Sequence, residues 1–187
     1  SRPGEINRMT PVFEQAVARL KADRPDLQVA VVAAGTVATE VAARVAAWPF
    51  RAQLVQEVEK YDAMRACDVA LATSGTVSTE LALAGAPMVI AYRFDGLSYA
   101  IMRPFFTGKF ATLFNIAADA EIARELIQTE ATPERMAAEV GRLLDDPAAR
   151  TDQAARQTAA LELMGRGAPD PSELAAEAVL AVIADRA

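Results

Sequence analysis

Short continuous runs of hydrophobic residues alternate along the chain with stretches of helical hydrophobic periodicity, and this order predicts β-strands and α-helices in turn. Short apolar runs, typical of strands that are buried on both faces, occur at residues 27–34, 69–72 and 88–92, with a smaller one at 52–55. Helical patterns separate or follow these runs at residues 10–23, 36–47, 60–67, 76–84, 119–128, 133–145, 148–164 and 172–186. The order predicts an α/β fold, a parallel sheet flanked by helices, with a C-terminal helical tail.

Proline and glycine positions set the expected helix boundaries. Thr10 followed by Pro11 predicts the start of the first helix, and residues 23–25 predict its end. Gly85 is expected to close the helix at 76–84, and Thr132 followed by Pro133 to open another. The apolar faces of the first and last of these helices are expected to be Phe13, Ala16, Val17 and Leu20, and Met136, Val140, Leu143 and Leu144.

The chain reads as a single domain over residues 1–187. Its 52% hydrophobic content suits one sizeable core, and the only clear linker is GRGAPDPS, residues 165–172, before the last helix. Residues 97–110 predict a short helix broken near Pro104 and then a loop, after which residues 110–115 return to the sheet. A cluster in this segment has two interpretations, a core helix with exposed cations or a surface that contacts acyl chains or anionic lipid: Met102, Arg103, Phe105, Phe106 and Lys109.

Charge and composition exclude several classes of function. The formal net charge of −6 disfavours nucleic acid as a partner. We find no apolar run that spans a bilayer and no signal-peptide core, so we expect a cytoplasmic protein. The single cysteine, Cys67, excludes an internal disulfide and a multi-cysteine metal site, and it fits a reducing compartment.

The chain has no histidine, so a general base must be a carboxylate or lie elsewhere. The charged run at residues 57–60 is interpreted as a solvated face.

The stretch LATSGTVSTELALAG, residues 71–85, is the main candidate site. Four small residues, 73–76, end a strand and begin a helix, so a ligand can approach the backbone, and the free N–H groups of the helix start favour an anion. In open parallel sheets such a junction lies at the edge where ligands bind. Glu80 follows one turn later, where its carboxylate can accept hydrogen bonds from a ribose. Ordinary turn and N-cap residues and a solvated glutamate are the alternatives.

Stronger phosphate signatures are absent from the sequence. There is no Gly-x-x-x-x-Gly-Lys-Ser/Thr loop and no Gly-x-Gly-x-x-Gly fingerprint. No two aspartates have Asp-x-Asp spacing, so we expect no divalent metal on a bound diphosphate. Backbone N–H groups and the helix dipole would stabilise the leaving charge.

Residues 74–93, SGTVSTELALAGAPMVIAYR, closely resemble the donor-binding segment of bacterial lipid-A-disaccharide synthases. SRPGEINR, residues 1–8, resembles the start of that family's second half. Arg93, Asn115 and residues 121–128 follow in matching order. The chain departs from the family at Asp119-Ala120, where a Gly-Arg pair is usual.

The resemblance implies one half of a B-type glycosyltransferase, a Rossmann-like domain that holds the UDP of UDP-2,3-diacylglucosamine. The acceptor would be lipid X, and the products the lipid A disaccharide precursor and UDP, with no cofactor and no bound metal. The family's N-terminal acceptor domain, with its catalytic carboxylate, is absent from these residues. We therefore expect no catalytic residue here and no turnover by this chain alone.

The family's site residues transfer to seven positions. Arg2 would meet the diphosphate, and Glu80 would hold the ribose. Asn115 would line the donor cleft, and Arg93 would neutralise phosphate or support the strand. The residues implied to contact the donor are Arg2, Ser74, Gly75, Thr76, Glu80, Arg93 and Asn115.

Two alternatives remain at this point. One is a stand-alone nucleotide-sugar-binding module without catalysis. The other is a different UDP-sugar enzyme, such as an undecaprenyl-linked N-acetylglucosaminyltransferase or an epimerase.

Overall fold

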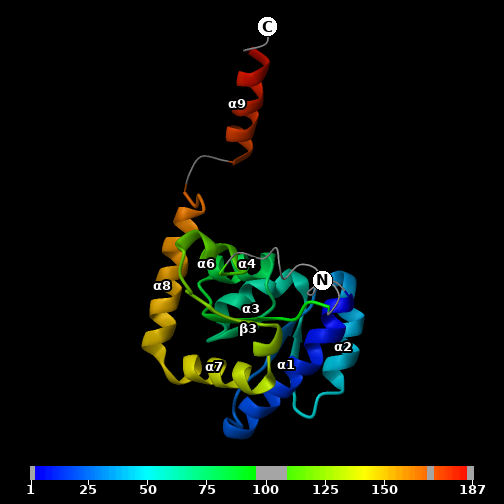
Figure 1. Ribbon diagram of the computed structural model, residues 1–187. Coiled ribbons are helices and arrows are strands. Elements are labelled where there is room, and N and C mark those ends of the chain that lie inside the picture. The colour runs from blue at the N-terminus through cyan, green and yellow to red at the C-terminus, as the bar shows by residue number, and fades with distance from the viewer. Residues whose placement is uncertain (1–2, 96–108, 168–170, 185–187) are drawn as a thin grey trace.

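Strands and helices alternate along the computed structural model, which describes residues 3–95, 109–167 and 171–184 (Figure 1). In the first half the elements are α1 (Pro3–Asp23), β1 (Ala30–Val32), η1 (Gly35–Val37), α2 (Ala38–Ala46), β2 (Gln53–Val55), η2 (Glu57–Glu59), α3 (Lys60–Ala66), β3 (Ala70–Ala72), α4 (Thr76–Ala84) and β4 (Met88–Tyr92). They continue with α6 (Leu113–Ala118), β5 (Arg124–Ile127), η4 (Gln128–Glu130), α7 (Pro133–Asp145), α8 (Pro147–Leu163) and α9 (Pro171–Ala184).

All strand pairs in the described residues are parallel, which confirms the predicted α/β class. The strands form two sheets, β1–β2 and β3–β4–β5, so the expected sheet is divided. Ala30 pairs with Gln53 in the smaller sheet, while Ala70 pairs with Met88 in the larger one. On the other side of β4, Ile90 pairs with Glu125.

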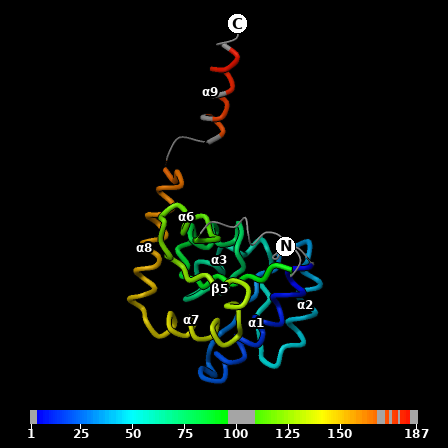
Figure 2. The backbone as a smooth tube through the Cα atoms, in the orientation of Figure 1, coloured from blue at the N-terminus to red at the C-terminus, as the bar shows by residue number. Residues whose placement is uncertain are grey.

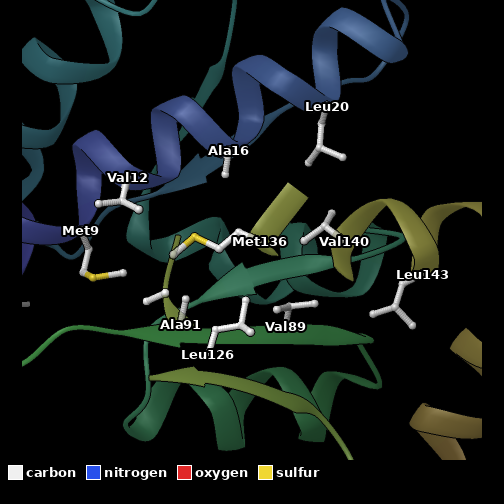
Figure 3. Close-up of a cluster of buried hydrophobic side chains, with 11 residues drawn as sticks. Met9, Val12, Ala16, Leu20, Val89, Ala91, Leu126, Met136, Val140 and Leu143 are labelled. Atoms are coloured by element: carbon white, nitrogen blue, oxygen red, sulfur yellow. The ribbon is translucent and has the colours of Figure 1, made fainter. Parts of the chain in front are cut away.

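β4 is the centre of the larger sheet and is covered on both faces. Val89 and Ala91 point towards α1 and α7, where they pack in a cluster that Figure 3 shows. Met88 and Ile90 point the other way, towards α4, α6 and α8. Because successive residues of a strand face opposite sides, burial of both sets requires the continuous apolar sequence of this strand. The predicted buried strand at 88–92 is confirmed.

The smaller sheet is less buried than the sequence predicts. Residues 27–34 contribute only the three-residue strand β1, whose Val32 is 39% exposed. Val41 and Val45 of α2 pack with Ala33 and with Ile6 of α1 in a separate cluster. The prediction of a long buried strand is therefore wrong, because that cluster covers only part of this narrow sheet.

The first helix begins earlier than Thr10. α1 starts at Pro3 and contains Pro11 in its interior, so the predicted N-terminus is wrong while the predicted end is confirmed. An interior proline removes one helical hydrogen bond and costs about 3 kcal/mol. Ile6 and Met9 precede Pro11 and are buried in two different clusters, so their packing offsets that loss.

Two predictions after residue 109 are wrong. The pattern at residues 119–128 predicts a helix, but β5 occupies 124–127 and pairs with β4. Residues 110–115 were expected to return to the sheet, but α6 begins at Leu113. In both cases the local sequence suits either structure, and the free edge of β4 determines which segment becomes the strand.

The C-terminal helices follow the sequence pattern closely. α7 starts where Thr132 accepts a hydrogen bond from the N–H of Arg135, and α8 follows it directly. α9 extends away from the rest of the molecule (Figure 2). Part of the predicted linker at 165–172 lies outside the described residues, as do residues 97–108 with their lipid-facing interpretation.

Candidate functional site

The junction between β3 and α4 has a backbone that requires glycine. Gly75 stands at the N-cap position with φ 141° and ψ −160°, a conformation that is essentially restricted to glycine. It has no side chain to accept hydrogen bonds from the first N–H groups of α4. The hydroxyl and the N–H of Ser78 both donate to the Gly75 carbonyl, at 2.6 and 3.2 Å, and so fix the turn. The helix therefore begins with backbone donors next to a residue that leaves space around them.

A pocket of about 510 Å³ opens at this junction. One wall is the first turns of α4, with Gly75, Thr76, Thr79 and Glu80, and the other is residues 111–113. The pocket lies beyond the carboxyl end of β3, the edge of a parallel sheet where ligands bind. The structure thus brings Gly75, Thr76 and Glu80 together, as the sequence predicts.

Glu80 is paired with a cation. The Nζ of Lys60, at the start of α3, lies 2.9 Å from the Oε1 of Glu80, and both side chains are partly buried. This hydrogen bond, with the carboxylate's charge, raises the pKa of Lys60 above its ordinary value. Lys60 also lies over the ring of Tyr61, 4.7 Å from the ring centre. A carboxylate has two oxygens and several lone pairs, so Glu80 keeps capacity for hydrogen bonds from a ligand.

The opposite wall of the pocket is held by a buried carboxylate. Glu125 of β5 accepts hydrogen bonds from the N–H groups of Ala111, at 2.6 Å, and Thr112, at 2.9 Å. The Thr112 hydroxyl and the Asn115 side-chain amide also donate to it. On the pocket side, the Ser74 hydroxyl donates to the Ala111 carbonyl at 3.4 Å. Ser74 therefore joins the junction after β3 to the far wall.

Asn115 lies beneath this wall and is fully buried. Its amide donates to the Ala123 carbonyl and to Glu125, at 2.9 and 2.7 Å. Its Oδ1 accepts the N–H groups of Ile122 and Ala123, at 2.8 and 3.2 Å. These contacts use both amide protons and both lone pairs, so in this structure Asn115 ties α6 to β5.

Arg93 lies at the end of β4 and contacts backbone. Its Nε and Nη2 both donate to the Ala131 carbonyl, at 3.0 and 2.6 Å, while its own carbonyl accepts from the Nε of Arg8. These contacts match the strand-supporting half of the sequence expectation. Arg2 lies outside the described residues.

Sequence reasoning missed two residues of this site. Glu125 fell inside a predicted helix, and Lys60 inside a charged run that was interpreted as solvated. Glu57 of the same run is exposed, as expected for a solvated face, and its carboxylate also accepts the Gly35 N–H at 2.6 Å. No local pattern marks these contacts, since the partners are 10 or more residues apart in the chain.

Asp119, where the sequence departs from the resemblance, has a backbone conformation that favours glycine. It closes α6 with φ 44°, a left-handed conformation that glycine adopts readily and aspartate tolerates. Its carboxylate lies 3.7 Å from the Nζ of Lys109, so this position carries an ion pair.

A second hollow, of about 550 Å³, lies between α1 and α7. Its cations are already paired, Arg19 with Glu134, Arg24 with Asp145 and Arg142 with Glu139. The hollow lies at the C-terminal end of α1, whereas Glu5 near the other end contacts Tyr92 at the carboxyl end of β4. It therefore faces the amino edge of the sheet, away from the usual ligand-binding edge.

In the described residues, no group of three or more His, Cys, Asp or Glu side chains is arranged to hold a metal ion. No helix within residues 3–95, 109–167 and 171–184 has the length and apolar character needed to cross a membrane.

Comparisons with known proteins agree with the resemblance in the sequence. The family model for lipid-A-disaccharide synthetase matches residues 1–179. The chain is 43% identical to the lipid-A-disaccharide synthase of Rhodospirillum centenum over 187 residues, which is 100% of this chain and 47% of that protein. Identity to the synthase of Paramagnetospirillum magneticum is 43%, over 96% of this chain and 47% of the relative.

A more distant relative shows similar coverage. The synthase of Trichlorobacter lovleyi is 36% identical over 91% of this chain and 44% of its own length. The chain thus spans about half the length of the curated relatives it matches. With a family model covering nearly all of its residues, the chain belongs to the lipid-A-disaccharide synthase family.

Proposed function

We propose that this chain is the part of a lipid-A-disaccharide synthase that binds the donor, UDP-2,3-diacylglucosamine. The observation that carries the proposal is the pocket between the first turns of α4 and residues 111–113, which combines exposed backbone donors with a carboxylate. A diphosphate favours the free N–H groups of a helix start, and a ribose favours a carboxylate that accepts from its hydroxyls.

The diphosphate would lie at Gly75 and Thr76. There the positive end of the α4 dipole and its N–H groups favour negative charge. Glu80 would accept hydrogen bonds from the ribose hydroxyls with the lone pairs that Lys60 leaves unused. Ser74 would support donor binding through its hydrogen bond to Ala111, and Asn115 through its hydrogen bond to Glu125. Direct phosphate contacts by Arg2 and Arg93 remain part of the proposal.

The proposed reaction transfers diacylglucosamine to lipid X. It forms a β-1,6-linked disaccharide precursor of lipid A and releases UDP by an inverting displacement. We assign the base that activates the acceptor to the acceptor-binding half of the longer relatives. We assign no catalytic residue to this chain. We also propose a cytoplasmic protein with peripheral contact to the inner membrane.

Titration calorimetry of this chain with UDP tests the donor site. We expect saturable binding that is equal with Mg²⁺ and with a chelator, because the described part of the pocket offers backbone donors and a single carboxylate, Glu80. Absence of UDP binding would contradict the donor site. A loss of binding on chelation would contradict its metal independence.

Activity measurements test whether transfer requires the acceptor-binding half. The chain alone, with UDP-2,3-diacylglucosamine and lipid X, should form no disaccharide. Adding the N-terminal half of the Rhodospirillum centenum synthase should restore transfer. Turnover by this chain alone would place the base among these residues and contradict the assignment.

A further inference from the structure

Glu125 is a charged residue at a buried strand position, where an apolar side chain would be more favourable. It lies in the interior of β5, beside Ile90 of β4, and only 8% of its surface is exposed. Burial of a carboxylate is unfavourable unless hydrogen bonds compensate for the lost water. An apolar side chain at this strand position would avoid that cost. The carboxylate must therefore supply something that packing alone does not.

Its carboxylate accepts four hydrogen bonds, three at Oε1 and one at Oε2. The N–H groups of Ala111 and Thr112, the Thr112 hydroxyl and the Asn115 amide all donate to it. The nearest arginine in the chain, Arg124, is paired with Glu121 and Glu130 instead. Hydrogen-bond donors thus surround the charge of Glu125, and they come from the segment that forms the pocket wall.

The wall needs such a support because it has no regular structure of its own. Ala111 and Thr112 lie before α6 and belong to no helix or strand, so no sheet ladder fixes their backbone. Both line the pocket opposite Gly75 and Glu80. Ala111 is held from two directions, since its carbonyl accepts from Ser74 and its N–H donates to Glu125. Movement of the carboxylate would change the distance between the two walls.

We infer that Glu125 is a positioning residue that sets the width of the donor pocket by holding residues 111–112 opposite the first turns of α4. This inference rests on the proposed function, because it concerns the site assigned to UDP. Glu125 itself is not exposed in the pocket and acts through Ala111 and Thr112. Asn115 supports it by orienting the carboxylate from below.

The substitution Glu125→Gln tests the inference with little change in shape. The amide nitrogen cannot accept, so at least one of the four donors loses its partner. We expect UDP binding to weaken about tenfold, the effect of one lost hydrogen bond to a charged group. Thr112→Val replaces only the hydroxyl by a methyl group and should weaken binding less.

A control for stability separates positioning from general weakening of the fold. Val140→Ala lies in the cluster on the far face of the sheet and should lower the melting temperature without changing UDP affinity at a temperature where both proteins are folded. Equal UDP affinity in Glu125→Gln and the wild type would overturn the inference. A loss in Glu125→Gln that Val140→Ala reproduces would also overturn it.

Amide hydrogen exchange gives a readout that does not depend on the ligand. In Glu125→Gln the N–H groups of Ala111 and Thr112 should exchange faster, while those of Val89 and Ile90 in β4 keep their protection. Unchanged protection at residues 111–112 would overturn the inference even if UDP binds. If the wild-type chain binds no UDP, the proposed function fails, and this measurement shows separately whether Glu125 holds the wall.

Discussion

Lys60 and Glu80 form an ion pair across two helices, with 2.9 Å between the Nζ and the Oε1. They stand at the start of α3 and in the second turn of α4, 20 residues apart in the chain. Among the described residues that line the pocket, Glu80 is the one carboxylate, and the pair orients it before any ligand binds. Such preorganisation lowers the entropy lost when a ribose binds.

Glu80→Ala should weaken UDP binding by about ten- to a hundredfold, since a hydrogen bond to a charged group contributes roughly 1.5–3 kcal/mol. Calorimetry with both proteins measures the change. The matched control is Glu40→Ala, which breaks the comparably exposed ion pair with Arg44 on α2, outside the pocket. Its UDP affinity should equal that of the wild type. An unchanged affinity in Glu80→Ala would contradict the ribose role.

Gly75→Ala should destabilise the chain by about 1–3 kcal/mol, because a residue with a Cβ is strained at this φ. No atom lies within 4 Å of the added Cβ, so the cost is conformational and not a clash. Urea unfolding measures it. UDP binding should weaken as well, since relief of the strain moves the backbone at the start of α4.

The control for this substitution is Gly141→Ala in the interior of α7. There the added Cβ meets its neighbours at 3.5 Å or more, and glycine in a helix is less favourable than alanine. We expect a gain of about 0.5–1 kcal/mol. Destabilisation in both variants would mean that backbone conformation is not the cause at Gly75.

Two glutamines one turn apart on α8 should respond in opposite directions to leucine. Gln153 exchanges hydrogen bonds with the N–H and carbonyl of Met88 and donates to the Ile122 carbonyl, so Gln153→Leu leaves buried backbone groups unpaired. We expect a loss of about 2–5 kcal/mol. Chemical unfolding gives the free energy for each variant.

Gln157 is fully buried, and its two polar side-chain atoms have no hydrogen-bond partner among the described residues. Gln157→Leu keeps the approximate volume and removes these atoms, so stability should be unchanged or rise by about 1 kcal/mol. A marked loss would show that the Gln157 amide makes a stabilising hydrogen bond in solution.

Cys67 should react slowly with iodoacetamide while the chain is folded. Burial, followed by the charge of Asp68, raises the pKa of its thiol, and the thiolate is the reactive form. The Sγ also donates to the Met64 carbonyl at 3.3 Å. Mass spectrometry of alkylation at pH 7.5, with and without urea, should show a much faster reaction in the unfolded chain.

The same shift predicts how stability depends on pH. Below the ordinary thiol pKa, about 8.5, both states hold the proton and Cys67 has no effect on the pH dependence. Above it the unfolded chain ionises first, so the free energy of unfolding falls until the higher folded pKa is passed. Cys67→Ala should reduce this alkaline loss, and an identical pH profile in both proteins would contradict the shift.

The sequence by itself determined the elements whose signals are local. The apolar run at 88–92 favours a strand that is buried on both faces. Gly85 can adopt the left-handed φ of 77° that ends α4. Small residues at 73–76, followed by Glu80, likewise marked one wall of the pocket. These features depend on a residue's own conformational range or on neighbours within a turn, which the sequence states directly.

Only the tertiary structure decided the features that depend on distant partners. β5 is a strand because the edge of β4 accepts it, and α1 extends past Pro11 because Ile6 and Met9 find buried positions. Lys60 and Glu125 belong to the site through contacts made across separate elements. A local pattern carries no information about such contacts, because the free energy that favours them arises only when the folded chain brings the partners together.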